Sequence, residues 1–113
     1  MSKTMSTTNR RAVEIHQIDW QGYRIEVRYC PSWSPSYEEI YGECMAHLEL
    51  MSLEEPRRAL PVTETGYRSH FIPAKFIDDQ GGAVAFARAW LDEEARSPKW
   101  KELEAASRQM SLL

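Results

Sequence analysis

Apolar and polar residues alternate along two neighbouring segments near the start of the chain, residues 13–20 and 23–29, which Gln21-Gly22 separates. A period of two is typical of a half-buried strand, and a two-residue break with glycine is typical of a hairpin turn. Pairing outward from this turn collects mostly apolar pairs on one face: Trp20 with Tyr23, Ile18 with Ile25, His16 with Val27, Glu14 with Tyr29. The opposite face collects mostly polar pairs: Asp19 with Arg24, Gln17 with Glu26, Ile15 with Arg28. A one-residue shift would exchange the faces, so the pattern predicts one register.

Two later segments predict further strands. Residues 43–52 alternate, with Cys44, Ala46, Leu48 and Leu50 on one face and Met45, His47, Glu49 and Met51 on the other. Residues 63–72 predict a fourth strand interrupted at Gly66, because a glycine inside a strand marks a bulge or the close approach of another backbone or a ligand. The connection 30–42 is rich in proline and serine, and we expect one helical turn near residues 37–41. Residues 53–61 form a polar link.

The period becomes helical in the last third of the chain. Residues 73–80 predict a short helix, opened by Pro73 and closed by Gly81-Gly82. Residues 83–95 predict the main core helix, and Ser97-Pro98 begins another whose apolar stripe is thin. The order of elements predicts an α+β fold, an antiparallel sheet of three to four strands followed by two to three helices packed on one face. We expect a disordered tail at residues 1–12 and a single domain at 13–113.

Charge and length narrow the classes of function. The 113 residues suit one domain, and a net charge of −3 disfavours non-specific binding to nucleic acid or to an anionic membrane. Two cysteines are too few for a disulfide framework, and no apolar run approaches the roughly 20 residues that cross a bilayer. We therefore expect a cytoplasmic protein without a membrane segment.

The two cysteines and three histidines do not predict a metal site. Cys44 and His47 lie three residues apart in a predicted strand, so their side chains point to opposite faces. No Cys-x-x-Cys or His-x-x-x-His spacing is present. We expect neither a metal nor another cofactor.

The densest group of reactive side chains lies between residues 63 and 70. We consider it a candidate ligand site, in which Arg68 holds a carboxylate or phosphate, Glu64 or His70 acts as a base, and Gly66 lets the ligand approach the backbone. The candidate ligand-binding residues are Thr63, Glu64, Thr65, Gly66, Tyr67, Arg68 and His70. The alternative is architectural: Tyr67 and Phe71 are core residues and Glu64 pairs with Arg68 on an exposed face. No recognised catalytic motif is present, so no catalytic residue is assigned and an enzyme is the less favoured reading.

Three aromatic residues outside that stretch, Trp33, Tyr37 and Trp100, are candidate partner-binding residues. Trp33 and Tyr37 form either an aromatic platform or a lid packed on the core, and Trp100 belongs to the thinly striped last helix. The polar sheet face would be left open or covered by a partner, and a homodimer through it is one option. Nucleic-acid binding by a local basic patch is disfavoured, because acids are interspersed among the basic residues.

Two segments carry a resemblance to a known family. The first is Leu60-Pro61-Val62-Thr63-Glu64-Thr65-Gly66-Tyr67-Arg68-Ser69-His70-Phe71, and the second is Gly81-Gly82-Ala83-Val84-Ala85-Phe86-Ala87-Arg88-Ala89-Trp90-Leu91-Asp92. Together they resemble a family of small bacterial proteins that has no established activity. The resemblance covers roughly the second half of the chain. It implies a bacterial cytoplasmic protein and supplies no catalytic residue.

These observations favour a non-enzymatic protein-binding module. The alternatives that remain open are a ligand-binding protein or enzyme with a site at Thr63–His70, and a nucleic-acid-binding protein that uses a local patch.

Overall fold

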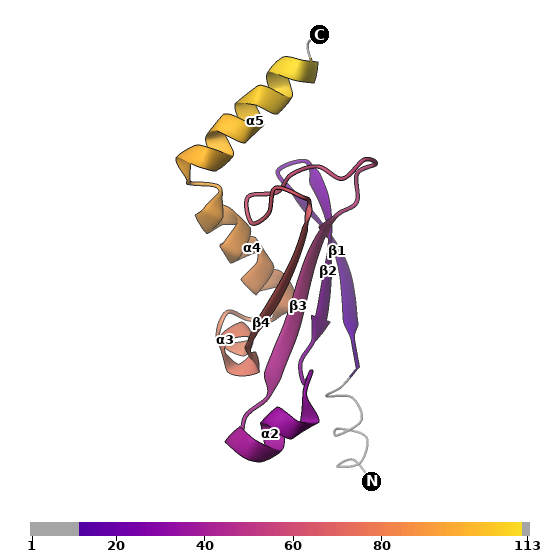
Figure 1. The fold of residues 1–113 in the computed structure, drawn as a ribbon, viewed down its shortest axis with the longest axis vertical. Helices are drawn as coiled ribbons and strands as arrows, with labels where there is room; N and C mark the ends of the chain where they lie inside the picture. The colour runs from indigo at the N-terminus through magenta and orange to yellow at the C-terminus, as the bar shows by residue number, and fades with distance from the viewer. Residues whose placement is uncertain (1–11, 112–113) are drawn as a thin grey trace.

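The computed structural model describes residues 12–111 (Figure 1), so most of the predicted tail, residues 1–11, lies outside the described part. The elements are β1 (Glu14–Trp20), β2 (Tyr23–Cys30), α2 (Pro35–Tyr41), β3 (Met45–Ser52), β4 (Tyr67–Pro73), α3 (Ala74–Asp79), α4 (Ala83–Glu94) and α5 (Pro98–Ser111). The strands form one antiparallel sheet in the order β1-β2-β3-β4, so each strand pairs with its neighbour in sequence. The predicted α+β fold is confirmed.

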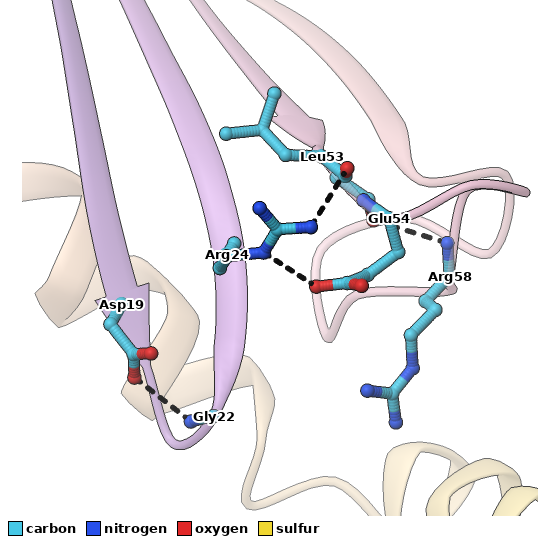
Figure 2. Close-up of polar contacts among 7 residues, drawn as sticks. Asp19, Gly22, Arg24, Leu53, Glu54 and Arg58 are labelled. Carbon is cyan, nitrogen blue, oxygen red and sulfur yellow. Dashed lines mark hydrogen bonds and ion pairs between the residues drawn. The ribbon is translucent and has the colours of Figure 1, made fainter.

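The first hairpin has the predicted register, from Glu14 opposite Tyr29 to Trp20 opposite Tyr23. Its two turn residues, Gln21 and Gly22, have φ angles of 49° and 86°. Positive φ at both positions gives the turn a twist that matches the strands, and glycine accepts that backbone without steric cost. The Gly22 amide donates to the Asp19 carboxylate at 3.0 Å, which closes the turn (Figure 2).

The apolar face of the sheet packs against α3 and α4. Helix α4 lies against β1 and β2. Helix α3 lies beside the end of β4 (Figure 1). The buried apolar residues of this core come from both layers: Ile18, Trp20, Tyr23, Ile25, Val27, Tyr29, Ala46, Leu48, Leu50, Ala74, Ile77, Ala83, Ala87 and Leu91. A polar contact joins the layers, because Trp20 Nε1 donates to Asp92 Oδ1 at 2.8 Å. The helices cover this apolar face of the sheet. The opposite, polar face is called the open sheet face below.

Two of the boundaries that differ from the sequence-based expectation have a clear local cause. Helix α2 is longer than the single turn expected at 37–41, because the Ser34 side chain caps its start by accepting from the Tyr37 amide and proline stands in its first turn. Strand β4 begins at Tyr67 and not at Thr63. The Thr63 hydroxyl donates to the Tyr67 carbonyl at 2.9 Å, so the segment before β4 closes into a turn and does not extend the sheet.

Helix α5 leaves the body of the molecule at the end opposite α2 (Figure 1). Its first turn is fixed by Trp100, whose side chain is 4% exposed and packs against Trp20 and Tyr23. The rest of the described helix surface is largely exposed. Within the described residues, no helix combines the length and the apolar character that crossing a membrane requires.

One buried polar atom in the core gives a stability prediction. The Tyr29 hydroxyl is buried and has no hydrogen-bond partner among the described residues, and burial raises the pKa of Tyr29 to about 12. An unsatisfied buried hydroxyl costs about 1–3 kcal/mol. We therefore expect Tyr29→Phe to leave the free energy of unfolding unchanged or to raise it by about 1 kcal/mol. Urea unfolding measures this; a loss of stability beyond about 1 kcal/mol would show that the hydroxyl is satisfied in solution.

Candidate functional site

The residues predicted as one ligand site, Thr63–His70, lie in three different places. The first is the turn before β4, where the hydroxyls of Thr63 and Thr65 both bond to the Tyr67 carbonyl, at 2.9 and 3.2 Å. Gly66 is buried in the same turn and lies against the backbone of Arg58. These hydroxyls and this glycine stabilise the turn before β4.

The second place is the open sheet face, which carries Tyr67, and Phe71 beyond the predicted site lies on the same face. The register of β4 sets Tyr67 opposite Met51 and Phe71 opposite His47, both on the polar side of β3. Tyr67 is 37% exposed and Phe71 is 50% exposed. The architectural interpretation that made both residues part of the core is therefore wrong, because alternation along β4 directs the core-facing positions to Arg68, His70 and Ile72.

The third place is the helix-covered side of β4, where Arg68 and His70 lie beside Trp90 of α4. The Arg68 guanidinium lies 5.5 Å from the centre of the Trp90 ring, and the His70 ring centre lies 4.8 Å from it. Burial, together with the Arg68 charge, lowers the pKa of His70 below its usual value. Glu64 does not pair with Arg68; it forms an ion pair with Lys99 of α5.

A cavity of about 360 Å³ lies where the turn before β4 meets the start of α5. It includes three of the seven predicted ligand residues: Thr63, Glu64 and Arg68. The remaining lining residues come from the preceding link and from the α4–α5 junction: Leu60, Pro61, Val62, Ser97, Lys99, Trp100 and Leu103. The cavity thus has two cationic side chains, one carboxylate and an apolar floor.

The open sheet face carries an aromatic cluster, which we define as Trp33, His47 and Phe71. The His47 and Phe71 rings stack with centres 4.4 Å apart, and the Trp33 ring lies 4.8 Å from His47 and 5.7 Å from Phe71. The Trp33 amide donates to the Met45 carbonyl at 2.8 Å, which folds the segment after β2 back over β3. The two larger rings leave the His47 side chain only 12% exposed, while Trp33 itself is 53% exposed.

Polar side chains continue from the cluster along β3 and β4. His47 Nε2 lies 2.6 Å from the Ser69 hydroxyl, and the Tyr67 hydroxyl donates to Glu49. A serine nucleophile would also need a third group to orient the histidine and donors for an oxyanion. His47 Nδ1 is 4.0 Å from Glu49, too long for a hydrogen bond. Glu49 therefore does not orient His47 as the third group of a serine triad would.

The three predicted partner-binding residues have different environments. Trp33 is exposed in the aromatic cluster, and Tyr37 is half-buried with its ring centre 4.5 Å from that of Tyr41. Trp100 is buried in the core and presents no free ring to a partner. The sequence analysis missed Phe71 and His47 as cluster members. Alternation had placed His47 on the polar face of its strand, and Phe71 was considered a core residue, so nothing indicated that two adjacent strands bring them together.

The basic side chains that a local nucleic-acid patch would use are engaged in separate contacts. Arg58 lies 4.2 Å from the centre of the Tyr23 ring, and Arg24 pairs with Glu54 and donates to the Leu53 carbonyl (Figure 2). Arg28 pairs with Glu26 at 3.0 Å. Over the described part of the chain, no three His, Cys, Asp or Glu side chains converge as metal ligands.

Comparison with known proteins gives one match. The family model described as the KlcB third domain matches residues 13–100, which include both segments that carry the resemblance and end at Trp100. No curated protein and no solved structure matches the chain. The matched range spans the sheet, α3, α4 and only the first residues of α5.

Proposed function

The chain belongs to the KlcB third domain family, and we propose that it is a protein-binding module whose binding surface is the open sheet face centred on the aromatic cluster. The observation that carries the proposal is the exposure of Trp33 and Phe71 side by side on a strand surface. Aromatic side chains are enriched among the residues that dominate binding energy at protein interfaces. Two such rings on one face supply a hydrophobic anchor.

The charges around the cluster favour a protein over a nucleic acid as the partner. Arg24 and Arg28 on β2 alternate with Glu26, and Glu49 stands on β3 beside them. A polyanion would meet two carboxylates within this face, whereas a protein surface with charges of both signs can complement it. We therefore propose a folded protein partner that offers an apolar contact to the cluster and mixed charges to its surroundings.

The family description is consistent with a docking role. It names the third domain of KlcB, so in that protein the fold is one domain among others. A domain that leaves one sheet face open, and whose described polar groups form no complete catalytic constellation, fits an adaptor function. We extend this function to the present chain as part of the proposal.

A site-directed photocrosslinking experiment tests the proposal. A photoreactive amino acid replaces Phe71, and a matched variant carries it at Ala89, which is exposed on α4 away from the open face. After irradiation in host lysate, we expect one protein to crosslink at position 71 and not at position 89. Adding Trp33→Ala to the first variant should reduce the crosslinked product at least about tenfold, because truncation of an aromatic anchor costs about 2 kcal/mol or more.

The other outcomes of this experiment are distinct. A crosslink between two copies of the chain would replace the proposed partner with a homodimer. Products that nuclease digestion removes would overturn the proposal in favour of nucleic acid. Equal products at positions 71 and 89 would show that the open face has no specific role.

A further inference from the structure

We propose that the cavity between the turn before β4 and the start of α5 binds a small carboxylate with a short hydrocarbon body. The proposal is independent of the open face, because none of the aromatic-cluster residues lines this cavity. Its volume of about 360 Å³ lies near the lower end of the range for small-molecule sites, about 300–1,000 Å³. A compact ligand therefore suits it.

Arg68 is the group that would recognise the carboxylate. Its guanidinium contacts the Trp90 ring and lies 3.4 Å from the Val62 carbonyl, and it forms no ion pair with any residue in the described range. The ring and the carbonyl fix the position of the guanidinium without neutralising it. A planar guanidinium held in this way can offer two parallel N–H groups to a carboxylate.

Lys99 provides a second positive charge at the rim, where it pairs with Glu64. The two side chains are 72% and 57% exposed, and a solvent-exposed ion pair of this kind contributes little to stability. A ligand carboxylate can therefore displace Glu64 from Lys99 at small cost. Glu64 then acts as an internal competitor that weakens binding of any anion to the cavity.

The apolar lining selects the rest of the ligand. Leu60, Val62 and Trp100 are buried apolar residues that line the cavity, and Leu103 extends this surface along α5. Leu60, Val62 and Trp100 are only 1%, 7% and 4% exposed, so a ligand meets their edges and half-buried Leu103. This small apolar surface suits a short hydrocarbon chain, whereas a plain inorganic anion would make no use of it. The combination of an arginine fork and an apolar floor points to an aliphatic monocarboxylate.

Titration with sodium hexanoate, followed by ¹H–¹⁵N NMR at constant ionic strength, tests the proposal. We expect saturable shifts of Arg68 Nε and of the amides of Glu64 and Lys99. Arg68→Gln should weaken binding at least about tenfold, since it removes a charge-assisted bidentate contact. Arg88→Gln is the matched control, because Arg88 lies on α4 and donates to the Asp19 carbonyl away from the cavity. Glu64→Gln should tighten binding several-fold.

The Glu64 variant separates a binding site from a structural contact. If the cavity only holds Glu64 and Lys99 together, Glu64→Gln leaves hexanoate binding absent, and the proposal fails. Inorganic phosphate provides the second arm: equal affinity for phosphate and hexanoate would overturn the role of the apolar floor. Retention of hexanoate binding by a Phe71→Ser variant would show that this site stands even if the proposed protein interface does not.

Discussion

Gly66→Ala is expected to lower the free energy of unfolding by about 2–5 kcal/mol. Gly66 has a φ angle of +82°, a conformation in which a side chain costs about 1–2 kcal/mol. An added Cβ would also lie 2.7 Å from the Arg58 carbonyl oxygen and 3.0 Å from Arg57 Cβ. Overpacking of this kind typically costs a further 1–3 kcal/mol, roughly, because the neighbours must move.

The backbone around Gly66 has little freedom to move. Ser52 joins the two segments: its amide donates to the Gly66 carbonyl at 2.8 Å, and its side-chain oxygen accepts from the Arg58 amide at 3.1 Å. The same oxygen accepts from the Glu54 amide at 3.2 Å, and Arg24 holds the Glu54 carboxylate from β2 (Figure 2). Relieving the contact with Arg58 would therefore disturb several of these bonds.

Gly22→Ala is the matched control for this prediction. Gly22 has a similar φ angle of +86°, but an added Cβ would meet no atom within 4 Å. Its substitution should cost only the conformational part, about 1–2 kcal/mol. Urea unfolding of both variants measures the difference. Equal losses in the two variants would show that the link moves away from residue 66 without cost.

The same glycine shows how far the sequence alone can go. A glycine within an alternating segment indicated that another backbone or a ligand comes close. The neighbour is the backbone of Arg58, which belongs to the polar link 53–61. That link has no hydrophobic period, so no pattern predicted where its backbone would pass. The sequence therefore indicated a close approach at Gly66 but could not identify what approaches it.

Elsewhere in the fold too, features that depend on neighbouring residues were predictable from the sequence, and features that depend on tertiary packing were not. The register of the first hairpin was predictable because a two-residue turn and one alternating pattern determine it together. The aromatic cluster was not predictable, because Trp33 comes from a connection that folds over β3 through the bond of its amide with the Met45 carbonyl. Alternation along β4 places Arg68 and His70 on one face, but the packing of Trp90 beside them depends on how α4 crosses the sheet.

For Trp100, the local sequence pattern and the observed packing lead to different conclusions. Its helix has a thin apolar stripe, which favoured a loose helix and a partner-binding tryptophan. The stripe is thin because only the start of α5 docks, with Trp100 inserted beside Trp20 and Tyr23 and with Leu103 partly buried against the core. The matched family range also ends at this residue, so the tryptophan completes the core of the shared domain while most of α5 lies beyond it.

Trp100→Ala is therefore expected to destabilise the protein by about 3–5 kcal/mol, the usual cost of removing a buried tryptophan side chain from a core. The centre of the Trp100 ring lies 6.4 Å from that of Trp20 and 5.7 Å from that of Tyr23, and Trp100 is 4% exposed. Its removal would therefore leave a cavity at the start of α5. Trp33→Ala is the matched control: that side chain is 53% exposed, and its loss should cost less than about 1 kcal/mol. Urea unfolding followed by far-UV circular dichroism compares the two without relying on tryptophan fluorescence. A larger loss for Trp33→Ala than for Trp100→Ala would contradict both the docking of α5 through Trp100 and the assignment of Trp33 to a binding surface.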